Sequence, residues 1–240
     1  AKPQKILFVL PALTAGGAER VMITLMNGID RTKFTPCFLT ISNKGELKDL
    51  IDPQIPFNSL GLNGIKFCLP WLLRFLRKER PDIIVSTMAH MNFAILMMKP
   101  FFPNTKFVVR EAITPSFLFK KYKNTAFIIK ALYKWLYPKA HIVLSPSQII
   151  FDEFRDILRM SSANFYVLPN PVSDIDIETA TPNNIVTSER NKTVHFLAAG
   201  RLGKQKGFDR LIEYLPQMTL KYNWRLTIIG EGDERNTLEA

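Results

Sequence analysis

Short runs of consecutive apolar residues recur along the chain and alternate with longer stretches in which apolar residues repeat every three to four positions. Apolar runs without polar alternation are typical of strands that are buried on both faces of a parallel sheet. Such runs predict strands at residues 5–10, 36–41, 83–86, 106–110, 142–144, 165–168, 193–199 and 224–229. The stretches between them predict helices at residues 18–28, 70–78, 92–98, 117–137, 148–158 and 208–215. This alternation indicates an α/β fold with parallel sheets.

A polar stretch that contains two prolines interrupts this pattern and is typical of a linker. It divides the chain into a first domain at residues 1–170, a linker at 171–192 and a second domain at 193–240. The last segment has room for only two strand–helix units, which cannot bury both faces of a parallel sheet. We therefore expect the second domain to be partial and the chain to be a fragment of a longer protein. Packing of this segment against the first domain is the alternative.

The composition excludes several classes of protein. A chain of 240 residues with 47% hydrophobic and 22% charged side chains is globular and not disordered. No apolar run approaches the ~18 residues that a membrane-spanning helix needs. The two cysteines, Cys37 and Cys68, form no CxxC pair. This excludes a disulfide scaffold and a cysteine-built zinc site, and it fits a reducing compartment such as the cytoplasm.

Positive charge is concentrated in one third of the chain. Residues 61–140 contain 14 Lys and Arg against 3 Asp and Glu, a difference that equals the whole net charge of +11. The other residues hold 18 of each sign. This asymmetry indicates an anionic partner: a membrane surface, a nucleic acid or a phosphorylated substrate. A surface that only keeps the protein soluble is the alternative.

The predicted helix at residues 117–137 carries part of this charge. Four of its lysines fall on one helical face: Lys120, Lys123, Lys130 and Lys134. Aromatic and aliphatic residues surround them. A basic amphipathic face with aromatic residues is typical of binding at a membrane surface. An ordinary core helix with a lysine face would show the same pattern.

Two glycine-containing turns follow predicted strands and open predicted helices. Gly16 and Gly17 follow the first strand, where glycines let a backbone approach a ligand and a helix N-terminus attracts an anion. A tight turn without a ligand is the alternative. In the second turn, Arg201 and Lys206 stand at the carboxyl end of a parallel strand, where α/β sheets bind ligands. Two cations beside a glycine-bearing helix start suit a diphosphate.

Several motifs together resemble those of family 4 (group 1) glycosyltransferases. GRL at residues 200–202, QKGFD at 205–209 and IIGEG at 228–232 resemble the entry to that family's second domain. GGAER at residues 16–20 resembles its first-domain glycine loop, SPS at 145–147 its S-x-S turn, and VLPNPV at 167–172 its interdomain segment. The matches occur in the family's order and span nearly the whole chain.

The resemblance implies a GT-B fold, in which a Rossmann-like acceptor domain and a Rossmann-like nucleotide-sugar domain enclose the active site. It implies transfer of a sugar, with retention, from a UDP- or GDP-sugar to a membrane-associated glycan or lipid-linked acceptor in polysaccharide or lipopolysaccharide biosynthesis. It implies neither a metal nor another cofactor, and no nucleic acid partner. The enzyme is then expected at the inner face of the membrane, held there as a peripheral protein by residues 61–140.

The resemblance also implies roles for individual residues. Arg201 and Lys206 would neutralise the diphosphate leaving group, whose charge grows as the glycosidic bond breaks. Donor or acceptor groups would lie beside the glycines of the turns, which are Gly16, Gly17, Gly200 and Gly230.

His90 follows a strand at its carboxyl end, where a neutral imidazole can bind an acceptor hydroxyl or phosphate. A position near a helix cap, with no ligand, is the alternative for His90.

The chain departs from the family pattern at two places. The paired glutamates that hold the donor in the family lie in a region beyond Ala240, so the 240-residue chain is expected to be inactive by itself. Many members have a histidine after the strand at residues 106–110, whereas this chain has Glu111. Arg110 and Glu111 either take a polar role in the active-site cleft or form an ion pair with each other.

Two alternative functions remain open at this point. The protein could be a non-catalytic basic module for anionic lipid or another polyanion, or a non-catalytic homologue.

Overall fold

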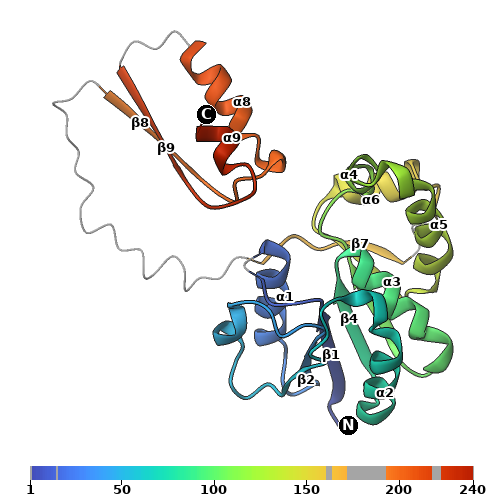
Figure 1. The fold of residues 1–240 in the computed structure, drawn as a ribbon. Coiled ribbons are helices and arrows are strands. Elements are labelled where there is room, and N and C mark those ends of the chain that lie inside the picture. The colour runs from blue at the N-terminus through green and yellow to red at the C-terminus, as the bar shows by residue number, and fades with distance from the viewer. Residues whose placement is uncertain (1, 15, 161–163, 172–192, 218–222, 240) are drawn as a thin grey trace. The chain divides into compact units, whose positions relative to one another are not determined.

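The computed structural model describes residues 2–14, 16–160, 164–171, 193–217 and 223–239. The chain divides into two compact units, residues 1–177 and 178–240 (Figure 1). Each unit has its own parallel sheet, with helices beside it. The predicted α/β class with parallel sheets is therefore confirmed. The predicted linker lies, apart from Pro171, outside the described residues, and the predicted domain boundaries stay predictions.

The first unit is built on a parallel sheet of seven strands in the order β3-β2-β1-β4-β5-β6-β7. These strands are β1 (Gln4–Leu10), β2 (Phe34–Thr40), β3 (Phe57–Ser59), β4 (Ile83–Thr87), β5 (Lys106–Arg110), β6 (Ile142–Ser145) and β7 (Phe165–Val167). The strand order reverses between β1 and β4. At such a switch point the connections leave the sheet in opposite directions, and a crevice opens at the carboxyl ends of the strands.

Helices cover both faces of this sheet: α1 (Gly17–Asn27), α2 (Leu69–Glu79), α3 (Ala89–Met98), α4 (Pro115–Lys121), α5 (Ala126–Leu136) and α6 (Gln148–Asp156). Successive side chains of β1 point to opposite faces. Leu7 and Val9 belong to the core that includes α2, α3, α5 and α6, whereas Ile6 and Phe8 belong to the core that includes α1. Burial on both faces explains why the central strands have no polar alternation.

Short 3-10 turns complete the described secondary structure: Leu47–Leu50, Ile65–Phe67, Lys99–Phe101, Lys123–Thr125, Tyr137–Lys139, Lys204–Lys206 and Leu215–Gln217. Among the helices that the structure describes, none has the length and apolar character needed to cross a membrane.

The second unit pairs β8 (Thr193–Ala199) with β9 (Asn223–Ile229) in parallel, beside α8 (Phe208–Tyr214) and α9 (Arg235–Glu239). Leu202, Phe208 and Leu215 are buried, but Leu197 and Ile229 are exposed. The described part of this unit therefore does not bury both faces of its sheet, as expected for a segment with only two strand–helix units. Two strands and two short helices have too few neighbours to cover both faces of the sheet.

The prediction of a single helix at residues 117–137 is wrong. The structure has α4 and α5 there, separated by the 3-10 turn at Lys123–Thr125. Three lysines within four residues repel one another, and Asn124 and Thr125 are weak helix formers, so the helix ends at this point. The four lysines therefore do not share one helical face. Lys130 and Lys134 remain neighbours on α5, one turn apart.

Candidate functional site

The residues predicted for the first domain gather at the carboxyl edge of its sheet. Gly16 and Gly17 follow β1, His90 follows β4 and Glu111 follows β5. β1 pairs with β4, and β4 pairs with β5, so the three turns are neighbours at one edge. The sheet thus brings together residues that are far apart in the sequence, at the switch point where α/β sheets bind ligands.

In the turn after β1, the carboxylate of Glu19 lies beside the start of α1. Glu19 is 4% exposed, and its Oε1 accepts a hydrogen bond from Thr14 Oγ1 at 2.5 Å. Its Oε2 would lie 2.3 Å from a Cβ placed on Gly16, the N-cap of α1. The negative charge that a helix N-terminus favours is therefore supplied at α1 by Glu19. A Cβ on Gly17 would have no heavy atom within 4 Å.

The turn after β4 has a strained backbone and no such carboxylate. Met88, the N-cap of α3, has φ +72° and ψ 129°, an uncommon conformation for a residue with a side chain. The first turn of α3 holds no acidic residue, and its N-cap side chain makes no hydrogen bond. His90 lies in this first turn with an exposed side chain. Neighbouring protein atoms displace part of its water and lower the pKa of the imidazole, which is therefore neutral at pH 7.

The end of β5 places a buried cation beside that turn. Arg110 is 2% exposed, and its Nη1 lies 3.4 Å from Thr87 Oγ1. Its Nη2 donates to Asn170 Oδ1 at 2.5 Å. Among the salt bridges of the described residues, none joins Arg110 to Glu111, so the ion pair considered as an alternative is not observed. Burial lowers the pKa of Arg110, and the nearby Glu111 acts in the opposite direction.

Glu111 is fully buried beneath this edge. Asn92 Nδ2 donates to its Oε1 at 3.1 Å, Tyr133 OH donates to its Oε2 at 3.4 Å, and Tyr137 OH donates to its Oε1. Burial raises the pKa of Glu111 to about 8, although the hydrogen bonds and Arg110 oppose the shift. The carboxyl group is therefore mostly protonated at pH 7. Because Asn92 also donates to the carbonyl oxygen of Arg110 at 3.0 Å, this network holds the end of β5 in place.

In the second unit, Arg201 and Lys206 are exposed near the carboxyl end of β8. Arg201 Nη2 lies 3.6 Å from Asp233 Oδ2. Lys206 Cε lies 3.5 Å from the place of a Cβ on Gly200, so the lysine side chain runs past the residue before Arg201. A Cβ on Gly230 would lie 1.9 Å from the carbonyl oxygen of Gly200. These two glycines let the ends of β8 and β9 pack closely.

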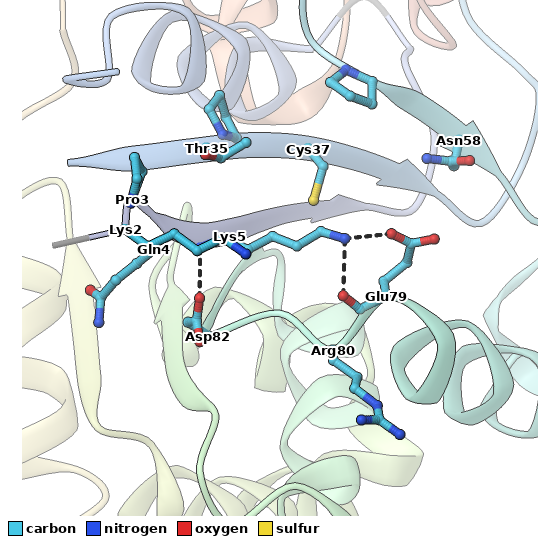
Figure 2. A pocket seen from close by; sticks show the side chains of 12 residues that line it. Lys2, Pro3, Gln4, Lys5, Thr35, Cys37, Asn58, Glu79, Arg80 and Asp82 are labelled. Atoms are coloured by element: carbon cyan, nitrogen blue, oxygen red, sulfur yellow. Dashed lines mark hydrogen bonds and ion pairs between the residues drawn. The ribbon is translucent and has the colours of Figure 1, made fainter. Parts of the chain in front are cut away.

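A cavity of about 690 Å³ lies at the opposite, amino-terminal edge of the first sheet (Figure 2). Lys5 crosses it and contacts Glu79, with 2.5 Å between Nζ and Oε2 and 2.9 Å between Nζ and the carbonyl oxygen. The backbone N–H of Lys5 donates to Asp82 Oδ2 at 2.7 Å. Burial raises the pKa of the Cys37 thiol to about 11, so this cysteine is not a reactive thiolate. The cavity holds none of the predicted site residues.

The sequence prediction missed Glu19 and Asn170, and it gave Arg110 no separate role. Glu19 carried a usable signal, because it stands at the third helical position after the N-cap Gly16, as in a capping box. Asn170 and Arg110 are 60 residues apart, and no local pattern indicates that they meet. In the described ranges no three His, Cys, Asp or Glu side chains cluster as metal ligands would.

Two family models match nearly the whole chain. The model for Glycosyltransferase Family 4 matches residues 15–174, and the model for Glycosyl transferases group 1 matches residues 182–240. A Campylobacter jejuni protein, N-acetylgalactosamine-N,N'-diacetylbacillosaminyl-diphospho-undecaprenol 4-alpha-N-acetylgalactosaminyltransferase, is 27% identical over 99% of this chain and 65% of its own length. The chain thus spans slightly less than two thirds of this relative.

Two solved structures share the fold. The lipopolysaccharide outer core galactosyltransferase WaaB has a TM-score of 0.64 at 20% identity, over 98% of this chain and 63% of its own. Anabaena HepE in complex with UDP has a TM-score of 0.64 at 18% identity, over 98% of this chain and 64% of its own. These likenesses show that the fold is of the GT-B class. With one family model spanning residues 15–174 and a second following it, the chain belongs to Glycosyltransferase Family 4.

Proposed function

We propose that the protein transfers a sugar, with retention, from a UDP- or GDP-sugar to a lipid-linked or membrane-associated glycan, without a metal. One observation carries this proposal. Arg201 and Lys206 present two exposed cations near the carboxyl end of β8, within the segment that matches the group 1 model. The UDP bound to Anabaena HepE supports a UDP-sugar as the donor.

The chemistry of the leaving group explains why two cations are needed. A nucleoside diphosphate gains negative charge as its bond to the sugar breaks, and fixed positive groups stabilise that charge. Among the described residues the salt-bridge partner of Arg201 is Asp233, at 3.6 Å and in solvent, and such exposed pairs contribute little. The guanidinium therefore keeps most of its capacity to bind phosphate oxygens. Gly200 lets the Lys206 side chain lie close to the same strand end.

Donor binding by the intact protein tests this role. We expect the double variant Arg201→Ala, Lys206→Ala to lose affinity for UDP by about 100-fold or more, because each charge-assisted hydrogen bond contributes about 1.5–3 kcal/mol. Lys204→Ala is the matched control, since Lys204 is an exposed cation of the same 3-10 turn. Titration calorimetry of UDP and GDP measures both the effect and the base preference. Equal affinities in the double variant and the control would contradict the proposal.

A lipid diphosphate is the acceptor class that the comparisons support. The name of the C. jejuni relative places its acceptor sugar on diphospho-undecaprenol. Retention and metal independence rest on membership of the family. The anomeric proton signal of the product tests retention, and transfer in the presence of a chelator tests metal independence.

His90, Gly16 and Gly17 are proposed to face the acceptor at the switch-point edge, whereas the donor phosphates are assigned to Arg201 and Lys206. Glu111 has no exposed surface, so its part in catalysis is proposed to be indirect, through the position of Arg110 and Asn92. Transfer by His90→Gln in the intact protein tests the exposed member of this group. A rate and an acceptor KM equal to those of the wild type would remove His90 from the site.

We further propose that residues 61–140 bind an anionic membrane surface. The three acidic residues of this segment are all engaged: Glu79 contacts Lys5, Asp82 accepts from the Lys5 backbone, and Glu111 is buried. The segment also exposes large apolar side chains, which are Phe67, Trp71, Met97, Phe101, Tyr122, Phe127, Ile128 and Trp135. Lysines accompany two of these rings: Lys121 Nζ lies 5.4 Å from the ring centroid of Tyr122, and Lys139 Nζ lies 3.6 Å from that of Trp135. Cationic and aromatic side chains together suit an anionic lipid interface.

Vesicle co-sedimentation tests the membrane contact. We expect binding to phosphatidylglycerol vesicles, much weaker binding to phosphatidylcholine vesicles, and a decrease with salt. Phe127→Ala with Trp135→Ala, and Lys130→Glu with Lys134→Glu, should each reduce binding at least 10-fold. Ile149→Ala, an exposed apolar residue outside the segment, is the control. Equal binding to heparin and vesicles, with no binding of UDP or GDP, would favour the non-catalytic basic module.

The proposal that the chain is part of a longer transferase has a direct test. The intact mass and full sequence of the natural protein should show a second domain with two glutamates seven residues apart. A longer protein without these glutamates would favour a non-catalytic homologue.

A further inference from the structure

The start of α3 differs electrostatically from two other helix starts in the first unit. Glu19 supplies a carboxylate at the start of α1, as described above. Glu153 does the same for α4, because its Oε2 accepts from the backbone N–H of Ser116 at 2.8 Å and its Oε1 accepts from Ser116 Oγ at 2.7 Å. At the start of α3 the described residues provide no carboxylate, and the Arg110 guanidinium lies beside Thr87, which directly precedes the N-cap.

This arrangement places two positive groups together in a poorly solvated place. A helix N-terminus carries about half an elementary positive charge, and Arg110 adds a full charge at 2% exposure. A buried charge is costly unless a counter-charge and hydrogen bonds compensate it. Within the described part of the chain, the hydrogen-bond partners of its guanidinium, Thr87 and Asn170, are neutral. Glu111 does not neutralise it fully, because burial keeps that carboxyl mostly protonated at pH 7.

An anion can reach Arg110 from the exposed side of the edge. Asn170, whose amide oxygen accepts from Nη2, is itself exposed and follows β7 in the segment at residues 168–171. Replacing this oxygen by a phosphate oxygen exchanges a neutral acceptor for a charged one, which makes a stronger hydrogen bond. His90 is exposed in the first turn of α3 and offers an imidazole N–H close in the sequence to Thr87, which pairs with Arg110 across β4 and β5.

We propose that Arg110 and His90, together with the N-terminal end of α3, bind a phosphate group of the lipid-linked acceptor. This rests on the proposed function for the identity of the acceptor, but the phosphate site itself does not. The sugar donor also carries phosphates, which are assigned above to Arg201 and Lys206. The experiment therefore has one arm for the site and one for the source of the phosphate.

The first arm measures binding of inorganic pyrophosphate to the 240-residue chain by titration calorimetry. The wild type should bind pyrophosphate at two places, and the double variant Arg201→Ala, Lys206→Ala at one. Adding Arg110→Gln or His90→Gln to that double variant should weaken the remaining binding at least 10-fold. Adding Arg31→Ala, which removes an exposed arginine that faces Asp52, should leave it unchanged. Unchanged binding in both test variants would overturn the site.

Arg110→Gln alters a buried network, so thermal unfolding by circular dichroism must accompany it. Asn170→Ala separates a binding role from a structural one. If Arg110 binds an anion in place of Asn170, this variant should bind pyrophosphate as well as or better than its parent. If the contact is only structural, Asn170→Ala should weaken binding as Arg110→Gln does, which would overturn the proposal.

The second arm measures transfer kinetics of the intact protein on two acceptors, a glycan on a polyprenyl diphosphate and the same glycan on an uncharged lipid. Arg110→Gln should raise the KM for the diphosphate acceptor at least 10-fold and leave the KM for the uncharged acceptor and for the donor unchanged. A rise in the donor KM alone would assign the phosphate to the donor and overturn the acceptor assignment. If the wild type transfers no sugar, the proposed function is wrong, while the pyrophosphate arm still decides the site.

Discussion

The turns after β1 and β4 are neighbours at one edge of the sheet, yet the helices that follow them begin in opposite electrostatic surroundings. The carboxylate of Glu19 lies over the start of α1, and Thr14 holds it there. At the start of α3 the nearest charge in the described contacts is the guanidinium of Arg110. The protein itself supplies a negative charge at the start of α1, whereas the start of α3 favours the binding of an external anion.

The comparison separates a recognisable motif from a binding site. The GGAER segment carries the family resemblance, but the close approach that Gly16 permits is used by Glu19. The turn after β4 has no comparable motif, yet it combines a strained Met88, an exposed His90 and a buried cation. Glycines at a helix start therefore do not by themselves indicate a phosphate site, because a carboxylate of the same chain can occupy the position.

The largest effect is expected from the charge state of Glu111. Its pKa is raised in the folded state, so the stability that this group contributes is greatest at low pH and is lost as the pH rises to about 8. The unfolding free energy should fall by up to about 1.4 kcal/mol per pH unit between pH 5 and pH 8. Glu111→Gln should lack this component. Urea unfolding at four pH values, followed by circular dichroism, measures both slopes.

Equal slopes in the wild type and Glu111→Gln would mean that Glu111 is ionised in the folded state. It would then compensate Arg110, and the contrast between the two helix starts would disappear.

Met88→Asp should give α3 a carboxylate of its own and so remove the contrast. Pyrophosphate binding to the chain that lacks Arg201 and Lys206 should fall by about 30-fold, because the new charge repels the ligand and takes its place. Stability should rise by about 0.5–1 kcal/mol from the new cap. Met88→Asn is the matched control: it accepts a positive φ and caps without charge, so it should keep most of the binding. Loss of binding in both variants would show that the backbone shape matters and not the charge.

Glu19→Ala tests the other half of the comparison. Removal of the carboxylate should destabilise the first unit by about 1–2 kcal/mol, since the start of α1 loses its nearby negative charge and Thr14 loses its hydrogen-bond partner. Chemical denaturation measures the loss. Thr14→Val should reproduce the smaller part of it, because the carboxylate stays while one hydrogen bond is removed. Unchanged stability in Glu19→Ala would mean that water caps α1 equally well.

Gly17→Ala is expected to have the smallest effect on stability. The new Cβ meets no heavy atom within 4 Å, and alanine is favoured over glycine in a helix by about 1 kcal/mol at most. A loss of transfer by the intact protein would then report a ligand close to this backbone. Gly16→Ala is the contrasting variant, because its Cβ displaces Glu19 and should lower stability as well as activity. Full activity of Gly17→Ala would exclude a close ligand at this position.

All eight predicted strands are present, because continuously apolar runs predict strands well. The continuously apolar runs of β1, β4 and β5 have few alternatives in water, because they must be covered on both faces. β3 was missed, since Phe57–Ser59 is a three-residue edge strand with no apolar run. The break between α4 and α5 was missed because aromatic and aliphatic residues continue across it at helical spacing.

The local sequence was enough to place the candidate site residues that stand in turns after strands. Gly16, Gly17, Arg201 and Lys206 follow predicted strands, and the order of strands and helices already places such turns at the carboxyl edge of a parallel sheet. The motifs that resemble those of the family lie in the same local segments. These conclusions need only the order of residues along the chain and the geometry of a βα unit.

Other features depend on contacts between distant residues, which only the folded chain defines. Arg110 meets Asn170, and Glu111 meets Tyr137, because strands and helices that are distant in the sequence pack at one edge. The raised pKa of Glu111 and the cost of burying the charge of Arg110 follow from the loss of water there, and burial is a property of the whole packed unit. The tertiary structure therefore decided which helix start was left to receive an anion.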